Sequence, residues 1–533
     1  MSVHYALDSL VVRGRRMFGW GFCLDTDTPL EQGTLRLALA DGSRHDVALL
    51  PGGYREDLAR LHPGVDHAGG AGFMVQAMLP SPPANGVATL RFRRAGEWIE
   101  LALPGFPGAF APPQAIPLRS VWRRFGQVAR ERGIGAALVA ALRGGVQRLV
   151  ARREARPRMD GSWPRGAVLI LDHGMGGGAN RYREARVEAW RAEGRPVVVA
   201  SPRTSTLDFR VEVHADAGRD ERSFPTQEAL LAQLGGVDAA VLEINSLVGF
   251  DDVTAMTAWA VAWRRAGTAR HLRFNLHDFH GACPAFTLVD AAGRFCDLPA
   301  LERCRSCLPA NAVSTLGLDL HRDVGEWRVA WRAFLEACDQ IAAFSTSSAA
   351  LLRRAHPTLS AERVHIAGHS GAAAGLRRVA PGTGRPVVVA VVGHLNRAKG
   401  ADLVRALAQC SDASGEPLAF VVFGTLEGGT GGHRSLRVLG SYTRDTLCDR
   451  LEAQRVAMAL LPSVCPETYS YVTDELMATG LPLAVLDRGA PAERVPGYSR
   501  GRVLQGDDPA SLLRQLVDFA AEQAAKPPNG TTP

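Results

Sequence analysis

Residues 1 to about 105 show a simple alternation of apolar and polar positions. Short runs such as 33–39, 44–49 and 87–92 place an apolar residue at every second position, between turns rich in Gly, Pro and Asp-Gly. This period of two is typical of antiparallel strands with one buried face. We predict an all-β sandwich domain over 1–105. The aromatic run 17–22 is assigned to its core, with stacking on a sugar ring as the alternative.

From residue 161 onwards the pattern changes to continuous apolar runs separated by amphipathic stretches. Such runs are typical of parallel strands that helices cover on both faces. We predict two Rossmann-like domains over 161–375 and 376–525, and a disordered tail over 526–533. The predicted strands are 167–171, 196–200, 239–244, 272–276 and 340–344 in the first domain and 386–392, 418–423, 457–461 and 483–486 in the second.

Residues 106–160 join these regions through a Pro-rich boundary and a basic stretch. Between Arg119 and Arg158 there are 11 arginines and two glutamates, a net charge of +9. Apolar residues recur there at helical spacing, which predicts one or two amphipathic helices. The segment is interpreted either as a solvated linker or as an attachment to an anionic membrane surface.

Composition and charge narrow the class of protein. The chain has 533 residues, 46% of them apolar, and a formal charge of +7. Because the basic linker accounts for more than this excess, the charge does not indicate binding to nucleic acid. No secretion signal or apolar run of about 20 residues is evident, and the nine cysteines are an odd number. We expect a reduced, cytoplasmic protein, peripheral at the inner membrane face if the linker binds lipid.

The strongest chemical signal is a pair of glutamates, Glu467 and Glu475, within the stretch 462–482. They flank a loop-to-helix junction where the backbone N–H groups of Tyr469, Ser470 and Tyr471 are free to bind an anion. Two carboxylates on either side of a bound diphosphate suit a nucleotide sugar. Otherwise they are a capping carboxylate and a surface glutamate.

This stretch resembles the E-x7-E motif of family 4 of the retaining glycosyltransferases. The resemblance continues through Ala478–Pro482 and 489–493. It implies the GT-B fold of two facing Rossmann domains over residues 161 to 525, preceded here by an extra β-domain. It also implies that Glu467 contacts the donor sugar and that Glu475 contacts the ribose.

A second signal is the loop 393–400, directly after the first strand of the second Rossmann-like domain. Lys399 is placed to neutralise the departing diphosphate, a charge that grows in the transition state. The family usually has an arginine immediately after the glycine, where this chain has His394. Either His394 donates a weaker hydrogen bond, or Arg397 takes the place of that arginine, or diphosphate binding is reduced.

Further candidates lie at predicted strand ends. Gly176, Gly177 and Gly178 form a glycine-rich turn, which in the family faces the donor diphosphate. His277 resembles the family's cleft histidine, which contacts the donor sugar. The resemblance also places Gly424, Thr425 and Tyr442 around the nucleotide base, with packing at the sheet edge as the alternative. Asn245 and Ser246 are assigned either to the acceptor side or to an ordinary turn.

Four cysteines follow His277 within 25 residues. Cys283, Cys296, Cys304 and Cys307 include a C-x2-C pair, which is one half of a common zinc site. We interpret this insert, residues 283–307, either as a structural zinc site or as reduced thiols. No catalytic cofactor is expected.

The sequence thus predicts a retaining, metal-independent glycosyltransferase. The expected donor is a UDP- or GDP-sugar, and the expected acceptor is a glycan or a lipid-diphosphate-linked sugar of bacterial surface polysaccharide or lipopolysaccharide synthesis. Glu467, His277 and Lys399 are the predicted catalytic residues. The alternatives are a GT-B sugar-nucleotide epimerase and a non-catalytic glycan or nucleotide-sugar binding protein, which His394 favours slightly.

Overall fold

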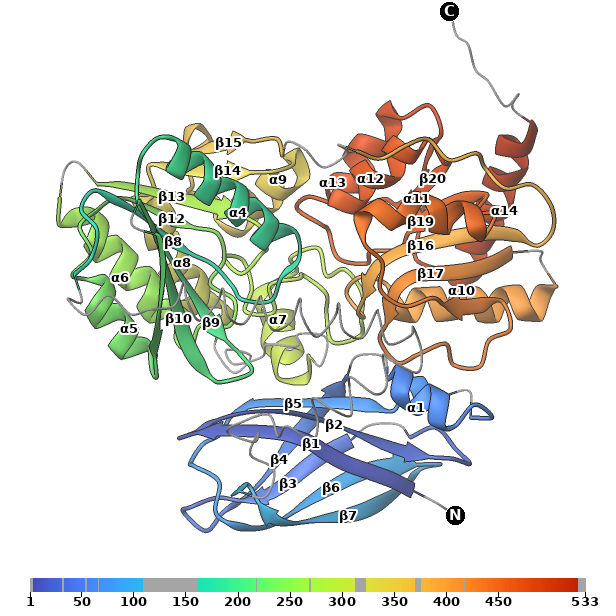
Figure 1. Ribbon diagram of the computed structural model, residues 1–533, viewed down its shortest axis with the longest axis horizontal. Helices are drawn as coiled ribbons and strands as arrows, with labels where there is room; N and C mark the ends of the chain where they lie inside the picture. Colours follow the sequence, from blue (N-terminus) through green and yellow to red (C-terminus); the bar gives the residue numbers. More distant parts are fainter. Residues whose placement is uncertain are drawn as a thin grey trace, which may run out of the picture.

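The computed structural model describes residues 3–30, 33–52, 55–65, 67–108, 162–216, 218–267, 270–311, 323–369, 375–415 and 418–525. These residues build an N-terminal β-domain and two α/β domains that lie side by side above it (Figure 1). The predicted helices of the basic linker and the predicted tail lie outside the described residues. None of the described helices is long and apolar enough to cross a bilayer.

The β-domain is one curled antiparallel sheet rather than the predicted sandwich of two sheets. Its seven strands pair in the order β1-β2-β5-β4-β3-β6-β7. The Tyr5 hydroxyl of β1 donates to the Ala102 carbonyl of β7 at 3.3 Å, which joins the two edges. The strands are β1 Val3–Arg13, β2 Arg16–Asp25, β3 Gly33–Ala38, β4 Arg44–Pro51, β5 Gly72–Met78, β6 Gly86–Arg94 and β7 Glu97–Phe106, with helices α1 Glu56–Leu61 and η1 Ala68–Gly70 between β4 and β5.

Curling lets one sheet enclose its own core, because every second side chain of each strand points inward. Met17, Val75 and Leu90 are fully buried there. In the aromatic run 17–22, the inward positions are instead Met17 and the glycines. Trp20 is 41% exposed, so its assignment to the core was wrong.

The first α/β domain has an eight-stranded sheet in the order β11-β10-β9-β8-β12-β13-β14-β15. The six strands β9, β8, β12, β13, β14 and β15 pair in parallel. Strands β10 and β11 form an antiparallel hairpin that extends the sheet beyond β9. The elements are β8 Ala167–Leu171, α4 Gly177–Ala192, β9 Val197–Arg203, β10 Asp208–Ala215, β11 Gly218–Phe224, α5 Gln227–Leu234, β12 Ala239–Ile244, α6 Val253–Arg265, β13 His271–Leu276, α7 Leu301–Cys307, η3 Leu308–Ala310, α8 Val324–Ala337, β14 Gln340–Ala343, α9 Thr346–Ala355, η4 Ala361–Arg363 and β15 Val364–Ile366.

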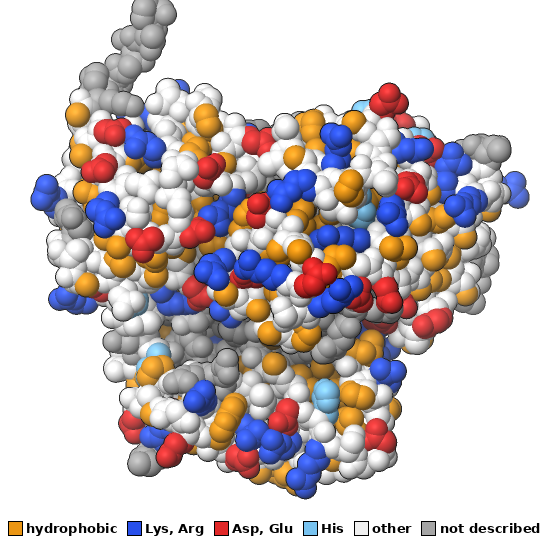
Figure 2. Space-filling model, turned by 180° about the vertical axis from the view of Figure 1, so that it is seen from behind, with side chains coloured by type: hydrophobic (Ala, Val, Ile, Leu, Met, Phe, Trp, Pro, Cys, Tyr) orange, Lys and Arg blue, Asp and Glu red, His pale blue; other side chains and the backbone are white. Residues whose placement is uncertain are grey.

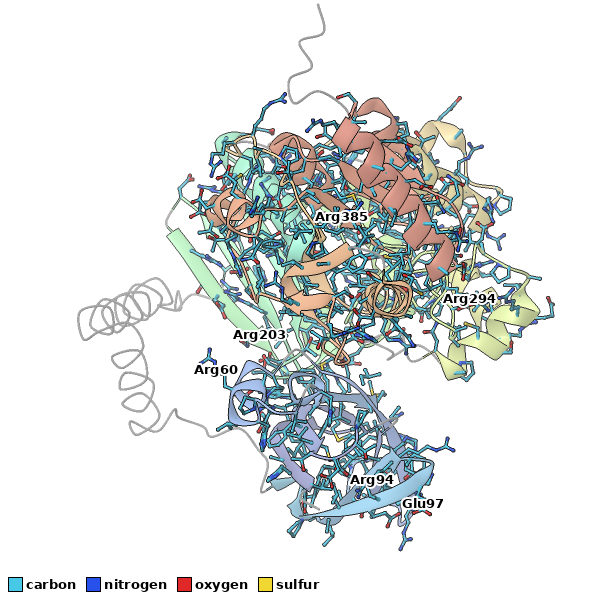
Figure 3. All side chains as sticks on the ribbon, turned by 90° about the vertical axis from the view of Figure 1, so that its right-hand side faces the viewer. Arg60, Arg94, Glu97, Arg203, Arg294 and Arg385 are labelled. Carbon is cyan, nitrogen blue, oxygen red and sulfur yellow. The ribbon has the colours of Figure 1, made fainter. Side chains whose placement is uncertain are left out.

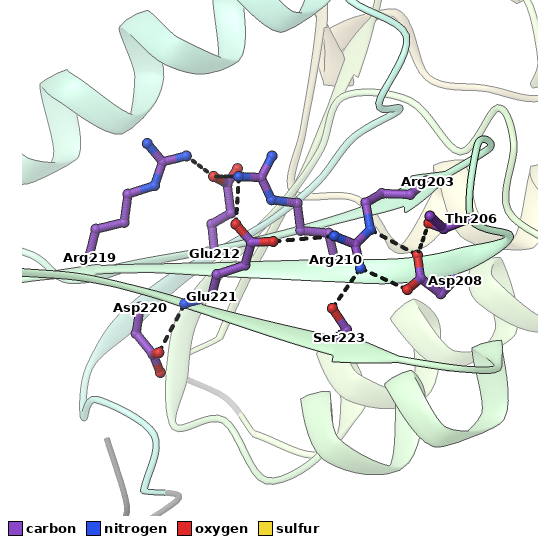
Figure 4. A network of polar contacts seen from close by, with 9 residues as sticks. All are labelled: Arg203, Thr206, Asp208, Arg210, Glu212, Arg219, Asp220, Glu221 and Ser223. Atoms are coloured by element: carbon purple, nitrogen blue, oxygen red, sulfur yellow. Dashed lines mark hydrogen bonds and ion pairs between the residues drawn. The ribbon is translucent and has the colours of Figure 1, made fainter. Parts of the chain in front are cut away.

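Charged side chains hold the β10–β11 hairpin and the turn before it (Figure 4). Arg203 binds Asp208 through two hydrogen bonds of 2.8 and 2.7 Å. Arg210 donates to Glu221 at 2.8 Å across the two strands. Bidentate Arg–carboxylate pairs fix geometry as well as adding energy, so the turn between β9 and β10 is firmly anchored.

The second α/β domain has six parallel strands in the order β18-β17-β16-β19-β20-β21, which is the Rossmann order. Its central strands are apolar except at their carboxyl ends, where β16 has His394 and β17 has Thr425, as expected for strands covered on both faces. The elements are β16 Val387–Leu395, α10 Ala401–Ser414, β17 Leu418–Leu426, β18 Leu436–Val438, α11 Arg444–Ala453, β19 Met458–Leu461, α12 Tyr471–Thr479, β20 Leu483–Leu486, α13 Gly489–Arg494, η5 Val495–Gly497, β21 Gly501–Leu504 and α14 Pro509–Ala525.

Basic and acidic side chains are interspersed over the face of the molecule seen in Figure 2. This mixture agrees with the near-neutral charge of the chain outside the basic linker. The carboxyl ends of parallel strands are where open α/β sheets bind ligands. The loops at these ends in the two domains are therefore the place to look for a site.

Candidate active site

Glu467 and Lys399 form an ion pair at the carboxyl ends of β19 and β16. Lys399 Nζ lies 3.3 Å from Glu467 Oε2, and the Ser463 hydroxyl donates to the other carboxylate oxygen. The Glu467 side chain is 9% exposed, whereas that of Lys399 is 46% exposed. The Glu467 carboxylate raises the pKa of Lys399. The ammonium is therefore charged and can be reached by an anionic ligand.

Two glycines allow this pair to form. Gly400 has φ +87°, and a Cβ there would lie 2.0 Å from the Pro462 carbonyl oxygen. A Cβ at Gly489 would lie 2.6 Å from the backbone nitrogen of Glu467. Both glycines let the backbone segments pack closely around the loop that carries Glu467.

His394 and Arg397 have partners within their own domain. His394 lies opposite Thr425 in the parallel register of β16 and β17, and its Nδ1 is hydrogen-bonded to the Thr425 hydroxyl. Burial and the neighbouring Lys399 lower the pKa of His394. Arg397 Nε donates to Asp402 at 2.8 Å. Gly424 meets Gly393 where these strands end, because a Cβ at Gly424 would lie 1.9 Å from the Gly393 carbonyl oxygen.

Glu475 lies on the second turn of α12, between two arginines. Its Oε1 is 3.5 Å from Arg181 of the first α/β domain and 3.8 Å from Arg444 of the second. Burial raises the pKa of Glu475, and the two arginines oppose that effect. Tyr442 is half-buried, and burial together with Glu475 raises its pKa. The predicted base-side residue Tyr442 and the predicted ribose ligand Glu475 thus lie together.

The N-terminus of α12 faces the glycine-rich turn of the other domain. Ser470 is the N-cap of α12, and its hydroxyl accepts a hydrogen bond from the Thr473 N–H at 3.4 Å. A Cβ at Gly178 would lie 3.0 Å from the Tyr471 ring. Gly176 is the N-cap of α4 and, like Gly177, has a positive φ. Two helix N-termini, each favouring an anion, therefore lie on opposite sides of one site.

His277 lies at the end of β13 within a group of rings. Its ring centroid is 4.9 Å from that of Tyr182 and 4.6 Å from that of Phe344. Burial lowers the pKa of His277 well below its usual value. Its Nε2 has no hydrogen-bond partner among the described residues. A neutral imidazole with a free nitrogen suits a contact with a sugar hydroxyl.

The site includes residues that the sequence did not indicate. His369, in the connection between the two α/β domains, bonds through Nδ1 to the Tyr471 hydroxyl at 2.7 Å and stacks on Tyr469 at 4.0 Å. Glu493 accepts hydrogen bonds from the N–H groups of Thr346 and Ser347, at the start of α9. Glu493 could have been found from the sequence, because it lies in the stretch 489–493 that carries the family resemblance. No sequence pattern includes His369.

The predicted acceptor-side residues Asn245 and Ser246 follow β12. The Ser246 hydroxyl donates to Asp278 at 2.6 Å, and the Asn275 amide donates to Asn245 at 2.7 Å. Burial raises the pKa of Asp278. Ser246 therefore connects the end of β12 with the loop that follows His277.

Cys283, Cys296, Cys304 and Cys307 all line one small cavity and form no disulfide. Within the described ranges, no three His, Cys, Asp or Glu side chains are arranged to hold a metal ion. Zinc binding thus stays a prediction, which metal analysis of the protein would test. Val289 of the same insert packs against Ala398 and Val464, beside the loop that carries Lys399.

No known protein-family model and no curated protein matches the chain. Among solved structures, it is similar to HepE from Anabaena in complex with UDP, at 15% identity over 67% of this chain and 91% of that one, with a TM-score of 0.39. It is also similar to a glycosyltransferase from Rickettsia africae, at 9% identity over 68% and 90% of the two chains, with a TM-score of 0.41. The pneumococcal O-GlcNAc transferase GtfA, in complex with UDP and GlcNAc, matches at 11% identity over 61% and 62%, with a TM-score of 0.33. TM-scores below 0.5 do not establish a shared fold. The two α/β domains are therefore assigned from the strand order of this chain alone.

Proposed function

We propose that this protein is a retaining glycosyltransferase of the GT-B type that transfers a sugar from a nucleotide sugar to an acceptor hydroxyl. The observation that carries the proposal is the pairing of Glu467 with Lys399, beside a second buried carboxylate, Glu475, on α12. The glycine-rich turn of the facing domain closes the other side. This arrangement offers cations and helix N-termini to a diphosphate and carboxylates to the sugars at its two ends.

In the proposed reaction, the bond between the anomeric carbon and the diphosphate oxygen breaks, and a bond to the acceptor oxygen forms on the same face. The acceptor proton passes to the departing phosphate oxygen. Lys399 and the N-terminus of α12 stabilise the charge that develops there. Glu467 and His277 position the donor sugar, and Glu475 holds the ribose.

Several residues have supporting roles in this proposal. Gly176, Gly177 and Gly178 approach the diphosphate, together with the N–H groups of Tyr469, Ser470 and Tyr471. Gly424, Thr425 and Tyr442 border the base. His394 and Arg397 lie beside the diphosphate, and both are held by neighbours, Thr425 and Asp402 respectively.

A donor screen tests the proposal. UDP- and GDP-sugars are titrated against the full chain by calorimetry, beginning with UDP-glucose and UDP-GlcNAc. The expected result is saturable binding of at least one donor and release of nucleoside diphosphate that rises when an acceptor is added. Acceptor-independent conversion of the donor sugar would instead indicate an epimerase.

The hydrogen bond between His394 and Thr425 favours one competing hypothesis, that the protein binds a nucleotide sugar without catalysing transfer. Donor binding without turnover, unchanged in Glu467→Gln, would support that reading and contradict ours.

For the acceptor and pathway, we propose a glycan or a lipid-diphosphate-linked sugar of bacterial surface polysaccharide synthesis. Attachment to an anionic membrane through Arg119–Arg158 would bring the enzyme to such a lipid. Sedimentation with phosphatidylglycerol vesicles tests this attachment. Binding that is lost on deletion of residues 119–158 supports it, and binding unchanged by that deletion contradicts it.

A further inference from the structure

Strand β2 of the β-domain has an outward face that the proposed function leaves unexplained. Met17 and Cys23 point into the domain core. Since side chains alternate along a strand, the even-numbered residues point the other way. They form an aromatic stripe that runs along the strand in the order Arg16, Phe18, Trp20, Phe22 and Leu24.

One end of this stripe contacts the first α/β domain, and the other end packs against η1, which contacts the second. At one end, Arg16 Nε lies 2.9 Å from Asp251, and its Nη1 donates to the Leu207 carbonyl at 3.0 Å. At the other end, Leu24 is buried against Leu58 and Ala68. Ala68 is the first residue of η1, and η1 is so close to the second α/β domain that a Cβ at Gly70 would lie 2.5 Å from the Gly428 carbonyl oxygen. Trp20 is midway between these contacts.

Both contacts lie at the edge where parallel sheets bind ligands. Leu207 is in the turn that follows β9, Asp251 follows β12, and Gly428 follows β17. These are carboxyl ends of strands. The Arg203–Asp208 pair of Figure 4 anchors the turn that receives Arg16. In Figure 1, β2 and β5 are on the side of the β-domain that faces the α/β domains. The stripe therefore borders the ligand-binding edge of both domains.

The chemistry of the stripe is that of a sugar platform. Trp20 is 41% exposed, and its ring centroid is 5.8 Å from that of Phe18. Ser9 of β1 pairs with Trp20, and Gln76 of β5 pairs with Phe18. Ser9 Oγ and Gln76 Oε1 have no hydrogen-bond partner among the described residues. Aromatic faces attract the C–H bonds of a sugar ring, and the two buried oxygens beside them have unused hydrogen-bonding capacity.

Gln76 also lies next to the first α/β domain. It lines a small cavity between the β-domain and the first α/β domain, together with Thr204 and Gly249. Gly249 is three residues beyond Ser246, whose hydroxyl is bound to Asp278 near His277. Gln76 therefore lies where the β-domain meets the loop that follows β12.

We infer that the β-domain binds the saccharide acceptor through Trp20, Phe18, Ser9 and Gln76. The inference rests on the proposed function in one respect, namely that the bound saccharide is the acceptor of the reaction. Binding of a saccharide at this face does not depend on it. The matched control is Trp98 on β7, which is 44% exposed and stacks under Arg91 at 4.7 Å. Its neighbour Glu97 marks the end of the β-domain farthest from the α/β domains (Figure 3).

The test is a glycan array of bacterial surface oligosaccharides probed with the full chain. The expected result is binding of at least one oligosaccharide, weakened at least tenfold in Trp20→Ala and in Gln76→Ala and unchanged in Trp98→Ala. Equal thermal melting of the variants shows that they are folded. No binding by the parent chain, or equal binding by Trp20→Ala, overturns the inference. A dimer in solution that Trp20→Ala dissociates overturns it too, because a second copy would then cover the face.

A calorimetric titration of UDP-glucose and the other donor sugars separates this inference from the proposed function. Trp20→Ala is expected to bind a donor as the parent chain does, with a raised KM for the acceptor alone. If the parent chain binds an array saccharide at Trp20 but no donor, the transferase proposal fails while the saccharide site stands.

Discussion

Arg181 of the first α/β domain and Glu475 of the second meet across the proposed site, with Nη1 and Oε1 3.5 Å apart. The Arg181 guanidinium also lies over the Tyr471 ring, 4.6 Å from its centroid. One side chain from α4 therefore contacts both the second glutamate of the E-x7-E motif and the N-terminus of α12. In the proposed enzyme, we expect Arg181 to hold the two domains together around a bound donor.

Replacing Arg181 tests this role. Arg181→Ala should raise the donor Kd about tenfold, because a charge-assisted contact contributes roughly 1–3 kcal/mol. Calorimetry with the donor measures the effect. The control is Arg191→Ala at the other end of α4, where the arginine pairs with Asp216. Equal donor affinity in Arg181→Ala and the parent chain would remove Arg181 from the site.

Lys399→Met should act on turnover more than on binding. The lost charge stabilises a leaving diphosphate that becomes more negative in the transition state, so kcat should fall about 10²–10³-fold. Lys399→Arg should recover part of the rate. Steady-state release of nucleoside diphosphate measures both variants. A rise in donor KM with kcat unchanged would show that Lys399 acts only in binding.

Because His369 is partly buried, the folded state should lose stability in mild acid. Burial lowers its pKa to about 4 in the folded chain, from 6.5. Above pH 6.5 both folded and unfolded states are neutral, and the histidine makes no contribution. As the pH falls from 6.5 toward 4, the unfolded state takes up the proton first, which favours unfolding by on the order of 1–2 kcal/mol at pH 5. His369→Gln should show a smaller drop in melting temperature between pH 7 and pH 5. An equal drop in both proteins would contradict this explanation.

A side chain at position 400, close to the Glu467–Lys399 pair, should destabilise the fold through the backbone. Gly400→Ala should destabilise the fold by roughly 1–3 kcal/mol, because the left-handed backbone and the contact with Pro462 both exclude a side chain. Gly415→Ala is the matched control, since Gly415 has φ +70° but open space around it. Urea denaturation should separate the two variants. Equal unfolding free energies would show that the Pro462 contact yields without cost.

The apolar runs predicted the central strands closely, because most side chains of a strand covered on both faces are buried. The runs 167–171, 239–244 and 483–486 coincide with β8, β12 and β20. The hairpin β10–β11 was missed, because ion pairs such as Arg210 with Glu221 stabilise it and leave no apolar run. The curling of the β-domain was missed as well, since alternation shows that one face is buried but not what covers it.

The site could be predicted only where chemistry follows from local sequence. Glu467 and Lys399 follow strands and precede helices, and Glu475 lies on the helix after Glu467, so their neighbourhood could be expected from the chain order. Arg181 and His369 reach the site through the docking of the two domains, which no local pattern encodes. The outward direction of Trp20 likewise depends on the register of β2.

The most direct test of the transferase proposal is the turnover of Glu467→Gln. This substitution keeps the size of the side chain and removes the charge that Lys399 and the donor sugar require. Acceptor-dependent nucleotide release should fall about 10²–10³-fold, with donor binding retained. Glu452→Gln, which changes an exposed side chain of α11, should keep the parent rate. An unchanged rate in Glu467→Gln would contradict the assignment of this site as the active site.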